Sequence, residues 1–268
     1  MPSEQQHSAR EVLSFYAEAG VDALVGEEPV NHFAQDAVES PRAMPKSTAM
    51  RAPEVKSAPP PLAANIAPPD VAAMEAREAV KNVQTLDELR KALGRFEGCA
   101  LRATATQMVF ADGNPEARVM FVGEAPGRDE DIEGLPFVGR SGKLLDRMLA
   151  AIGLDRTQAY IANIFPWRPP GNRTPTPQES QICLPFIRKQ IELVDPDVLV
   201  CLGGPSATTL LGIKEGITKS RGRWVSYDTG KREIRALPTF HPAFLLRSPL
   251  QKRLAWRDLL AIKKALGE

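Results

Sequence analysis

The feature that most constrains the fold is an alternation of short apolar runs with longer helical patterns. Apolar runs bounded by turn residues occupy 118–122, 159–164, 197–202 and 234–239. Helical patterns lie between and after them, at 141–152, 177–194, 205–212 and 250–266, and 219–227 adds an arginine-rich, hairpin-like excursion. Short buried strands that alternate with helices are typical of a parallel sheet covered on both faces. We therefore predict an α/β fold.

The chain before this pattern has a different character. Residues 1–40 form an acidic extension in which 9–26 has helical spacing, and 41–70 contains eight prolines among many alanines, which indicates a flexible linker. Residues 71–94 predict a helical lead-in, with Thr85 as the cap of its second half. The main domain is expected over residues 95–268.

The charge is unevenly distributed, although the total is only +1. Residues 1–80 hold 6 basic and 12 acidic side chains, whereas residues 81–268 hold 28 and 21. The segment 214–257 alone carries 11 basic and 3 acidic residues. Such clustering favours a polyanionic partner, nucleic acid before a membrane surface, with a solvated basic face as the alternative.

Several protein classes are excluded by composition. No run of 18 apolar residues exists, so no membrane span is expected, and the opening residues lack a secretory signal pattern. The three cysteines, Cys99, Cys183 and Cys201, are too few for a disulfide framework. We expect a cytoplasmic, monomeric protein with reduced thiols.

Polar residues follow the ends of the four predicted strands. These segments are 123–127, 163–173, 203–205 and 241–247. In open α/β sheets, ligands bind beyond the carboxyl ends of the strands. A carboxylate (Glu124), an amide (Asn163), a glycine turn and the domain's only histidine (His241) are therefore expected to converge on one site.

The glycine-rich segment 123–145 does not match a nucleotide-binding loop. Gly142-Lys143 is followed by Leu144, and Phe137 occupies the place of the first Walker glycine. The dinucleotide spacing fails as well, because Glu124 interrupts it. The acidic residues of this segment are either functional or solvated loop charges. For His241 and Phe137, the alternative to a functional role is packing in the core.

Four segments carry a resemblance to a known family: VMFVGEAPGRDEDIEGLPFVGRSGKLLDRML at 119–149, YIANIFPWRPPGNRTPTPQES at 160–180, DPDVLVCLGGPSA at 195–207 and HPAFLLR at 241–247. The chain resembles the uracil-DNA glycosylase superfamily, most closely its family 4, over about residues 95–266. The resemblance implies a four-stranded parallel sheet in a three-layer αβα sandwich. It also implies a monofunctional glycosylase of base excision repair that flips uracil out of single- and double-stranded DNA. The alternative is a non-catalytic or very slow protein that binds uracil or abasic sites in DNA.

The resemblance also implies roles for individual residues. His241 would donate a hydrogen bond to O2 of the departing uracil, and Asn163 would read the O4/N3 edge. Phe137 would stack on the flipped base, and Glu130 would crowd its C5 edge and so reject thymine.

The residue that orients the attacking water stays open at this point. In glycosylases of the superfamily with a GQDPY motif, an aspartate stands where this chain has Ala125, beside the base. Either Glu124 or Asn172 then orients the water, or the dissociative step carries most of the rate.

The arm at 241–247 would supply DNA contacts. Leu245 or Leu246 would wedge into the base stack, and Arg247 would hold a flanking phosphate. Further DNA contacts are expected from Arg173, Lys219, Arg221 and Arg223.

The family usually carries a [4Fe–4S] cluster on four cysteines. At those four places this chain has Cys99 and Cys183, with Phe96 and Trp167 at the other two. Two thiolates do not hold a cubane cluster. We therefore expect no metal or other cofactor, with the two aromatic rings filling the space of the cluster.

Overall fold

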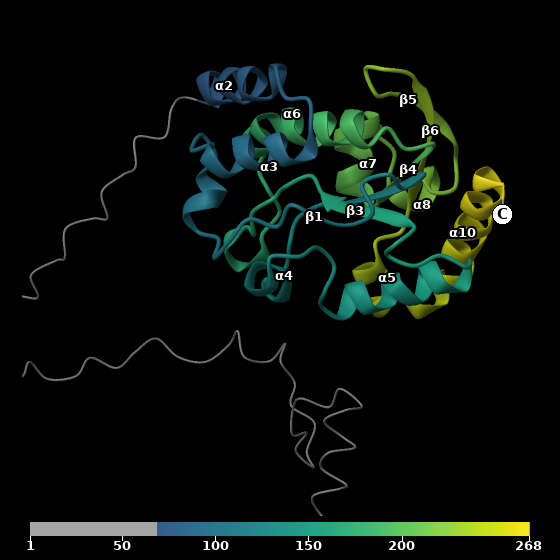
Figure 1. The fold of residues 1–268 in the computed structure, drawn as a ribbon. Helices are drawn as coiled ribbons and strands as arrows, with labels where there is room; N and C mark the ends of the chain where they lie inside the picture. The colour runs from purple at the N-terminus through teal and green to yellow at the C-terminus, as the bar shows by residue number, and fades with distance from the viewer. Residues whose placement is uncertain (1–68, 268) are drawn as a thin grey trace, which may run out of the picture. The chain divides into compact units, whose positions relative to one another are not determined.

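The computed structural model describes residues 69–267 (Figure 1). The predicted acidic extension at 1–40 and nearly all of the predicted linker lie outside the described residues. The linker's last two residues, Pro69 and Asp70, instead begin the first described helix. None of the described helices is long and apolar enough to cross a membrane.

The sheet has six strands in the order β1-β3-β2-β4-β6-β5. Their bounds are β1 Ala111–Gly113, β2 Val119–Gly123, β3 Ala159–Asn163, β4 Val198–Leu202, β5 Val225–Asp228 and β6 Glu233–Thr239. The four predicted strands are confirmed as the parallel centre of this sheet.

The prediction of a four-stranded, all-parallel sheet is wrong at both edges. β1 pairs antiparallel with β3, and β5 pairs antiparallel with β6. β1 has only three residues and no apolar run, so periodicity could not reveal it. β5 belongs to the arginine-rich excursion, which turns back on β6 as a hairpin.

Twelve helical segments are described. They are α2 Pro69–Lys81, α3 Leu86–Arg95, η2 Ala100–Ala103, α4 Arg128–Glu133, α5 Arg140–Ala151, η3 Pro170–Asn172, α6 Pro177–Val194, α7 Gly204–Leu211, α8 Ile217–Ser220, α9 Pro242–Arg247, η4 Pro249–Gln251 and α10 Lys252–Leu266. The predicted cap is confirmed, since the Thr85 hydroxyl accepts a hydrogen bond from the Glu88 amide at 3.2 Å. α4 was expected as an acidic loop, but acidic side chains in a first turn stabilise a helix N-terminus.

Helices cover both faces of the sheet, as predicted. Successive residues of the central strands point to opposite faces of the sheet. Met120 and Leu199 join the core beneath α2, α3 and α6, whereas Phe121 and Val200 join the core beneath α5 and α10 (Figure 1). The predicted lead-in at 71–94 packs into the first of these cores.

Candidate functional site

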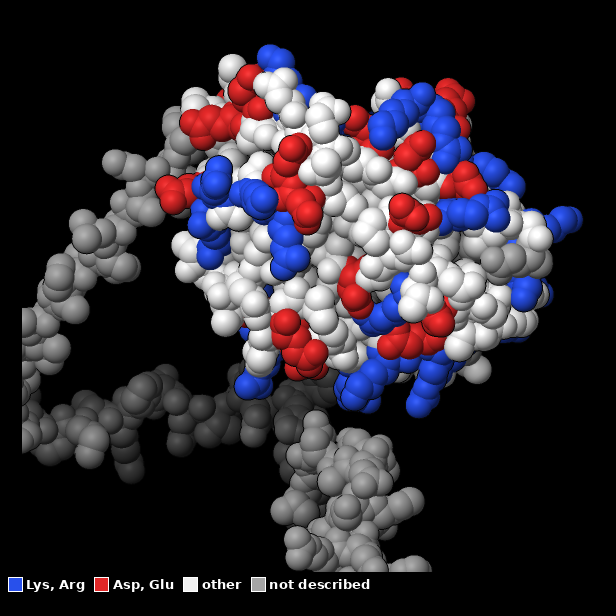
Figure 2. Space-filling view, viewed as in Figure 1, with Lys and Arg blue, Asp and Glu red and all other residues white. Residues whose placement is uncertain are grey.

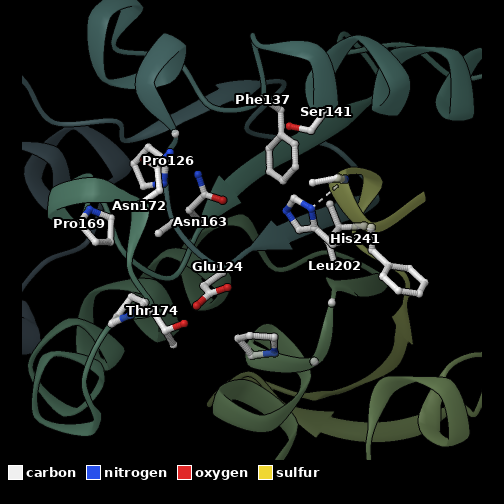
Figure 3. Close-up of a pocket in the computed structure, with 18 of the residues that line it drawn as sticks. Glu124, Pro126, Phe137, Ser141, Asn163, Pro169, Asn172, Thr174, Leu202 and His241 are labelled. Atoms are coloured by element: carbon white, nitrogen blue, oxygen red, sulfur yellow. Dashed lines mark hydrogen bonds between the residues drawn. The ribbon is translucent and has the colours of Figure 1, made fainter. Parts of the chain in front are cut away.

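The candidate site is a cavity of about 560 Å³ beyond the carboxyl ends of β2, β3, β4 and β6. Its wall includes nine of the predicted site residues: Glu124, Ala125, Glu130, Phe137, Asn163, Asn172, Arg173, His241 and Arg247. Figure 3 shows Phe137, Asn163 and His241 grouped on one side, with Glu124 across from them. The parallel sheet thus brings together segments that are more than 100 residues apart in the chain.

Asn163 is the most deeply placed polar side chain of the cavity. It ends β3 directly opposite Gly123 of β2, and it is 6% exposed. Its Oδ1 atom is buried and accepts no hydrogen bond from any described residue. An unsatisfied buried acceptor costs about 1–3 kcal/mol, so Oδ1 is suited to a ligand that brings a donor.

Gly123 makes this arrangement possible because it has no side chain. A Cβ atom at this position would overlap Oδ1 of Asn163 and lie 2.6 Å from Cζ of Phe137. The amide and the aromatic ring therefore meet over the bare backbone of the strand end.

His241 caps the N-terminus of α9 at the cavity wall. Its Nδ1 atom accepts a hydrogen bond from the Ala243 amide at 3.1 Å, so the proton of the neutral ring is on Nε2. Burial and the positive charge of Arg247 lower the pKa of His241 to about 4. His241 is therefore a neutral hydrogen-bond donor at ordinary pH.

The two candidates for orienting water differ in their contacts. The Glu124 carboxylate makes no hydrogen bond with a described residue, and burial raises its pKa above the usual value. Oδ1 of Asn172 accepts a hydrogen bond from Nε of Arg168 at 2.8 Å. Glu124 therefore offers the cavity unengaged acceptor oxygens, whereas the Asn172 oxygen already accepts one hydrogen bond.

Phe137 is held in an unusual backbone conformation. Its φ angle is +55°, in the left-handed region, which costs a residue with a side chain about 1–2 kcal/mol. Its ring centroid lies 5.5 Å from that of His241, and the two planes are tilted by 30°. The structure thus holds an aromatic face beside the histidine at the cost of local strain.

Glu130 braces the loop that carries Phe137. Its carboxylate accepts hydrogen bonds from the amides of Gly127, Val138 and Gly139 at 3.0 to 3.1 Å. The Glu130 side chain also lines the cavity. Its contact with the C5 edge of a base stays a prediction.

Two of the predicted DNA contacts are not supported by the surroundings of their side chains. Leu245 is 1% exposed and belongs to the core beneath α9, whereas Leu246 is 37% exposed. Arg221 forms a two-pronged ion pair with Asp258, which is 1% exposed, and also donates to the Leu254 carbonyl. A core leucine cannot enter a base stack, and a guanidinium committed to a buried carboxylate is not available to phosphate.

The other predicted DNA contacts lie at or near the surface. Arg173 sits at the cavity rim with its guanidinium on Glu179, and Arg223 pairs with Glu215 at 2.7 Å. Lys219 and Arg247 are exposed and form no ion pair with a described residue. The face shown in Figure 2 carries intermixed acidic and basic side chains.

Cys99 and Cys183, the cysteines expected at two of the cluster positions, lie together in the core. Sγ of Cys99 is 3.8 Å from Sγ of Cys183, and this contact together with burial raises the pKa of the Cys183 thiol. Phe96 and Trp167 are 8% and 3% exposed in the same core. No three residues of the types His, Cys, Asp and Glu converge as metal ligands within 69–267. These donors do not fit a four-cysteine cluster.

Further cavity residues were not predicted. Ser141, Thr174 and Phe244 also line the wall. Thr174 and Phe244 fall in or next to segments expected at the strand ends, so their position in the sequence could have predicted their place in the cavity. Ser141 lies in the first turn of α5, and only the packing of that helix brings it to the cavity.

Comparison with known proteins identifies related sequences. Residues 110–260 match the model of the uracil DNA glycosylase superfamily. The chain is 46% identical over 151 residues to the type-4 uracil-DNA glycosylase of Thermotoga maritima, covering 56% of this chain and 77% of that protein. It is 39% identical over 190 residues to the type-4 enzyme of Archaeoglobus fulgidus, covering 69% and 96%. It is also 39% identical over 186 residues to that of Saccharolobus solfataricus, covering 68% and 84%.

Proposed function

The chain belongs to the uracil DNA glycosylase superfamily, and we propose that it excises uracil from DNA in the cavity between Asn163, Phe137 and His241. The reaction breaks the bond between N1 of the base and C1′ of the sugar, water adds its hydroxyl to C1′, and the proton that the water loses ends on the uracil anion. The target base must leave the duplex stack to enter a cavity of this depth.

The observation that carries this function is the unpartnered Oδ1 of Asn163, in the same cavity as a neutral histidine donor. Uracil presents an N3–H donor between two carbonyl acceptors. The N3–H would supply the hydrogen bond that Oδ1 lacks, and His241 would supply the donor that O2 needs. Phe137 would cover the face of the base, since aromatic stacking contributes about 1–3 kcal/mol per base.

The chemistry follows from where charge develops. Bond cleavage places negative charge on the uracil, chiefly at O2 and O4, and positive charge on the sugar. A donor already in place at O2 stabilises the transition state more than the ground state. Because His241 is neutral, it stabilises the anion by hydrogen bonding and does not need to lose its proton.

Glu124 would serve the sugar side of the reaction. Its carboxylate is unengaged, so it can accept a hydrogen bond from a water molecule and direct the water oxygen towards C1′. In its ionised form it also stabilises the positive charge of the sugar. The Asn172 oxygen already accepts a hydrogen bond from Arg168, whereas the Glu124 carboxylate accepts none from a described residue, so we assign the water to Glu124. Asn172 would line the cavity beside it.

DNA would be held by the arm that follows His241. Leu246 is the exposed apolar side chain of α9 and would fill the gap that the flipped nucleotide leaves in the stack. Arg247 lines the cavity rim and would bind a phosphate beside that nucleotide.

We also propose that the enzyme works without an iron–sulfur cluster. The two thiols at Cys99 and Cys183 are half of the donors a cubane cluster needs, and Phe96 packs its ring 5.0 Å from that of Phe186. Purified protein is expected to contain no stoichiometric iron and to lack absorbance near 400 nm. An iron content approaching four atoms per chain would contradict this.

The test of the function is excision from an end-labelled oligonucleotide with one uracil, in EDTA, followed by alkali and gel analysis. Cleavage is expected at uracil and not at thymine, with strong loss in His241→Ala and Asn163→Ala. Asn114→Ala is the matched control, because its amide oxygen only accepts a hydrogen bond from Glu116 in a surface turn.

The alternative outcomes separate the remaining possibilities. Intact DNA that is retained in a mobility shift would support a protein that binds uracil without turnover. No cleavage together with no retention would refute the proposed substrate. A monomeric state and a cytoplasmic location stay predictions.

A further inference from the structure

Arg156 lies outside the cavity but directly behind the loop that carries Phe137. It follows α5, in the connection to β3, and its side chain is 25% exposed. Nη1 donates to the Pro136 carbonyl at 3.1 Å, and Nη2 donates to the Phe137 carbonyl. Arg156 does not line the cavity, so it cannot contact a bound base.

Two carboxylates fix the orientation of this guanidinium. Nε donates to Asp146 of α5 at 2.8 Å, and Nη1 contacts Asp112 of β1 at 2.5 Å. Asp146, Asp112 and the two carbonyls together use donors on all three guanidinium nitrogens. The planar fork of arginine matches this arrangement, which a lysine ammonium cannot reproduce.

The Phe137 carbonyl is also confined from the other side. A Cβ atom on Gly142, in the first turns of α5, would overlap the carbonyl carbon and oxygen of Phe137. The peptide therefore lies between the bare backbone of Gly142 and the guanidinium of Arg156. This confinement accounts for a phenylalanine kept at a φ of +55°.

We propose that Arg156 is a positioning residue for base recognition, which acts by holding the Phe137 peptide so that the ring faces the cavity. The proposal rests on the proposed function, because it assumes that Phe137 stacks on the base. Without the guanidinium, two carbonyls lose their donors and two carboxylates lose their counter-charge. The loop then relaxes from the left-handed conformation, and the ring moves away from its place beside His241.

The test measures kcat/KM for a single-stranded uracil oligonucleotide in four proteins: wild type, Arg156→Met, Phe137→Ala and the double variant. Loss of one base–aromatic stack corresponds to a fall of roughly 5- to 160-fold. We expect Arg156→Met to fall within this range. If Arg156 acts through Phe137, the double variant is expected to lie within about twofold of Phe137→Ala alone. Multiplicative losses in the double variant would overturn the proposal.

Inhibition by free uracil gives a second readout, which does not depend on DNA binding. The inhibition constant is expected to rise in Arg156→Met by a factor similar to that in Phe137→Ala. Arg156→Lys keeps the charge but not the fork, and is expected to lose less than Arg156→Met. If Arg156→Met does not fold, Arg156→Lys and Asp146→Asn are measured in its place, alone and with Phe137→Ala. Unchanged inhibition by uracil in these variants would then refute the proposal.

Arg118→Met is the matched control for general destabilisation. Arg118 also joins a carboxylate, Asp197, at 2.7 Å and a carbonyl, that of Leu266, at 2.8 Å, but at the opposite end of β2. It is expected to lower the melting temperature without changing kcat/KM or inhibition by uracil. If Arg156→Met only reproduces these effects, the positioning role is wrong while the proposed function stands. If wild type itself does not excise uracil, the proposed function fails first.

Discussion

Gly123→Ala is the smallest change that tests the geometry of the cavity. The added methyl would overlap Oδ1 of Asn163 and lie 2.6 Å from Cζ of Phe137, whereas ordinary contacts begin at 3.4 Å. Both side chains must therefore move, by about 1 Å at the ring. Misplacement of reacting groups on this scale costs about 100-fold in rate, and overpacking costs about 1–3 kcal/mol in the free energy of unfolding.

The assay for Gly123→Ala is kcat/KM on a uracil oligonucleotide, beside a thermal melt followed by circular dichroism. We expect a loss of about 100-fold or more in kcat/KM and a fall of about 2–12 °C in melting temperature. Gly94→Ala is the control, because a Cβ atom there has nothing within 4 Å. In an exposed helix position this change stabilises by about 0.5–1 kcal/mol and should leave activity unchanged. If Gly123→Ala keeps activity within threefold of wild type, the assignment of the cavity to the base is refuted.

Three further predictions concern His241 and the DNA contacts. The pH profile of kcat/KM should stay level as pH falls through 6.5, because the pKa of His241 is lowered to about 4 and the ring stays neutral; a limb at 6.5 that disappears in His241→Gln would contradict this. Leu246→Ala should reduce excision from duplex DNA more than from single strands, without lowering the melting temperature. Leu245→Ala removes a core side chain and should lower the free energy of unfolding by about 2–5 kcal/mol. Equal effects of the two changes on duplex excision would count against Leu246 as the wedge. Arg247→Gln should reduce the slope of log DNA affinity against log salt concentration by about 1. Arg221→Gln should leave this slope unchanged and lower the free energy of unfolding by about 3–5 kcal/mol. A reduced slope in Arg221→Gln would reverse this assignment.

The sequence pattern predicts the centre of the fold because that information is local. Four apolar runs became the four parallel strands, and the helical periodicity at 177–194 became α6 with the same bounds. The place of the site follows from the same pattern, because parallel strands align their carboxyl ends. Glu124, Asn163 and His241 could therefore be expected together without any coordinates.

For several residues, the surroundings of the side chain depend on neighbours that are distant in the sequence. Leu245 and Leu246 are identical and adjacent, and only the packing of α9 buries one and exposes the other. The partner of Arg221 is Asp258, 37 positions away, and a count of basic residues cannot show such pairing. β1 was missed because three residues carry no periodicity, and it exists through its pairing with β3.

The sequence by itself thus determined the α/β class, the helices on both faces and the edge of the sheet at which the candidate site lies. These depend on periodicity, turn residues and strand direction, which neighbouring residues encode. Only the tertiary structure decided how Phe137 is held, with its peptide between Gly142 and Arg156. Close packing and hydrogen-bond geometry join residues that are distant in the chain, so no local pattern contains them.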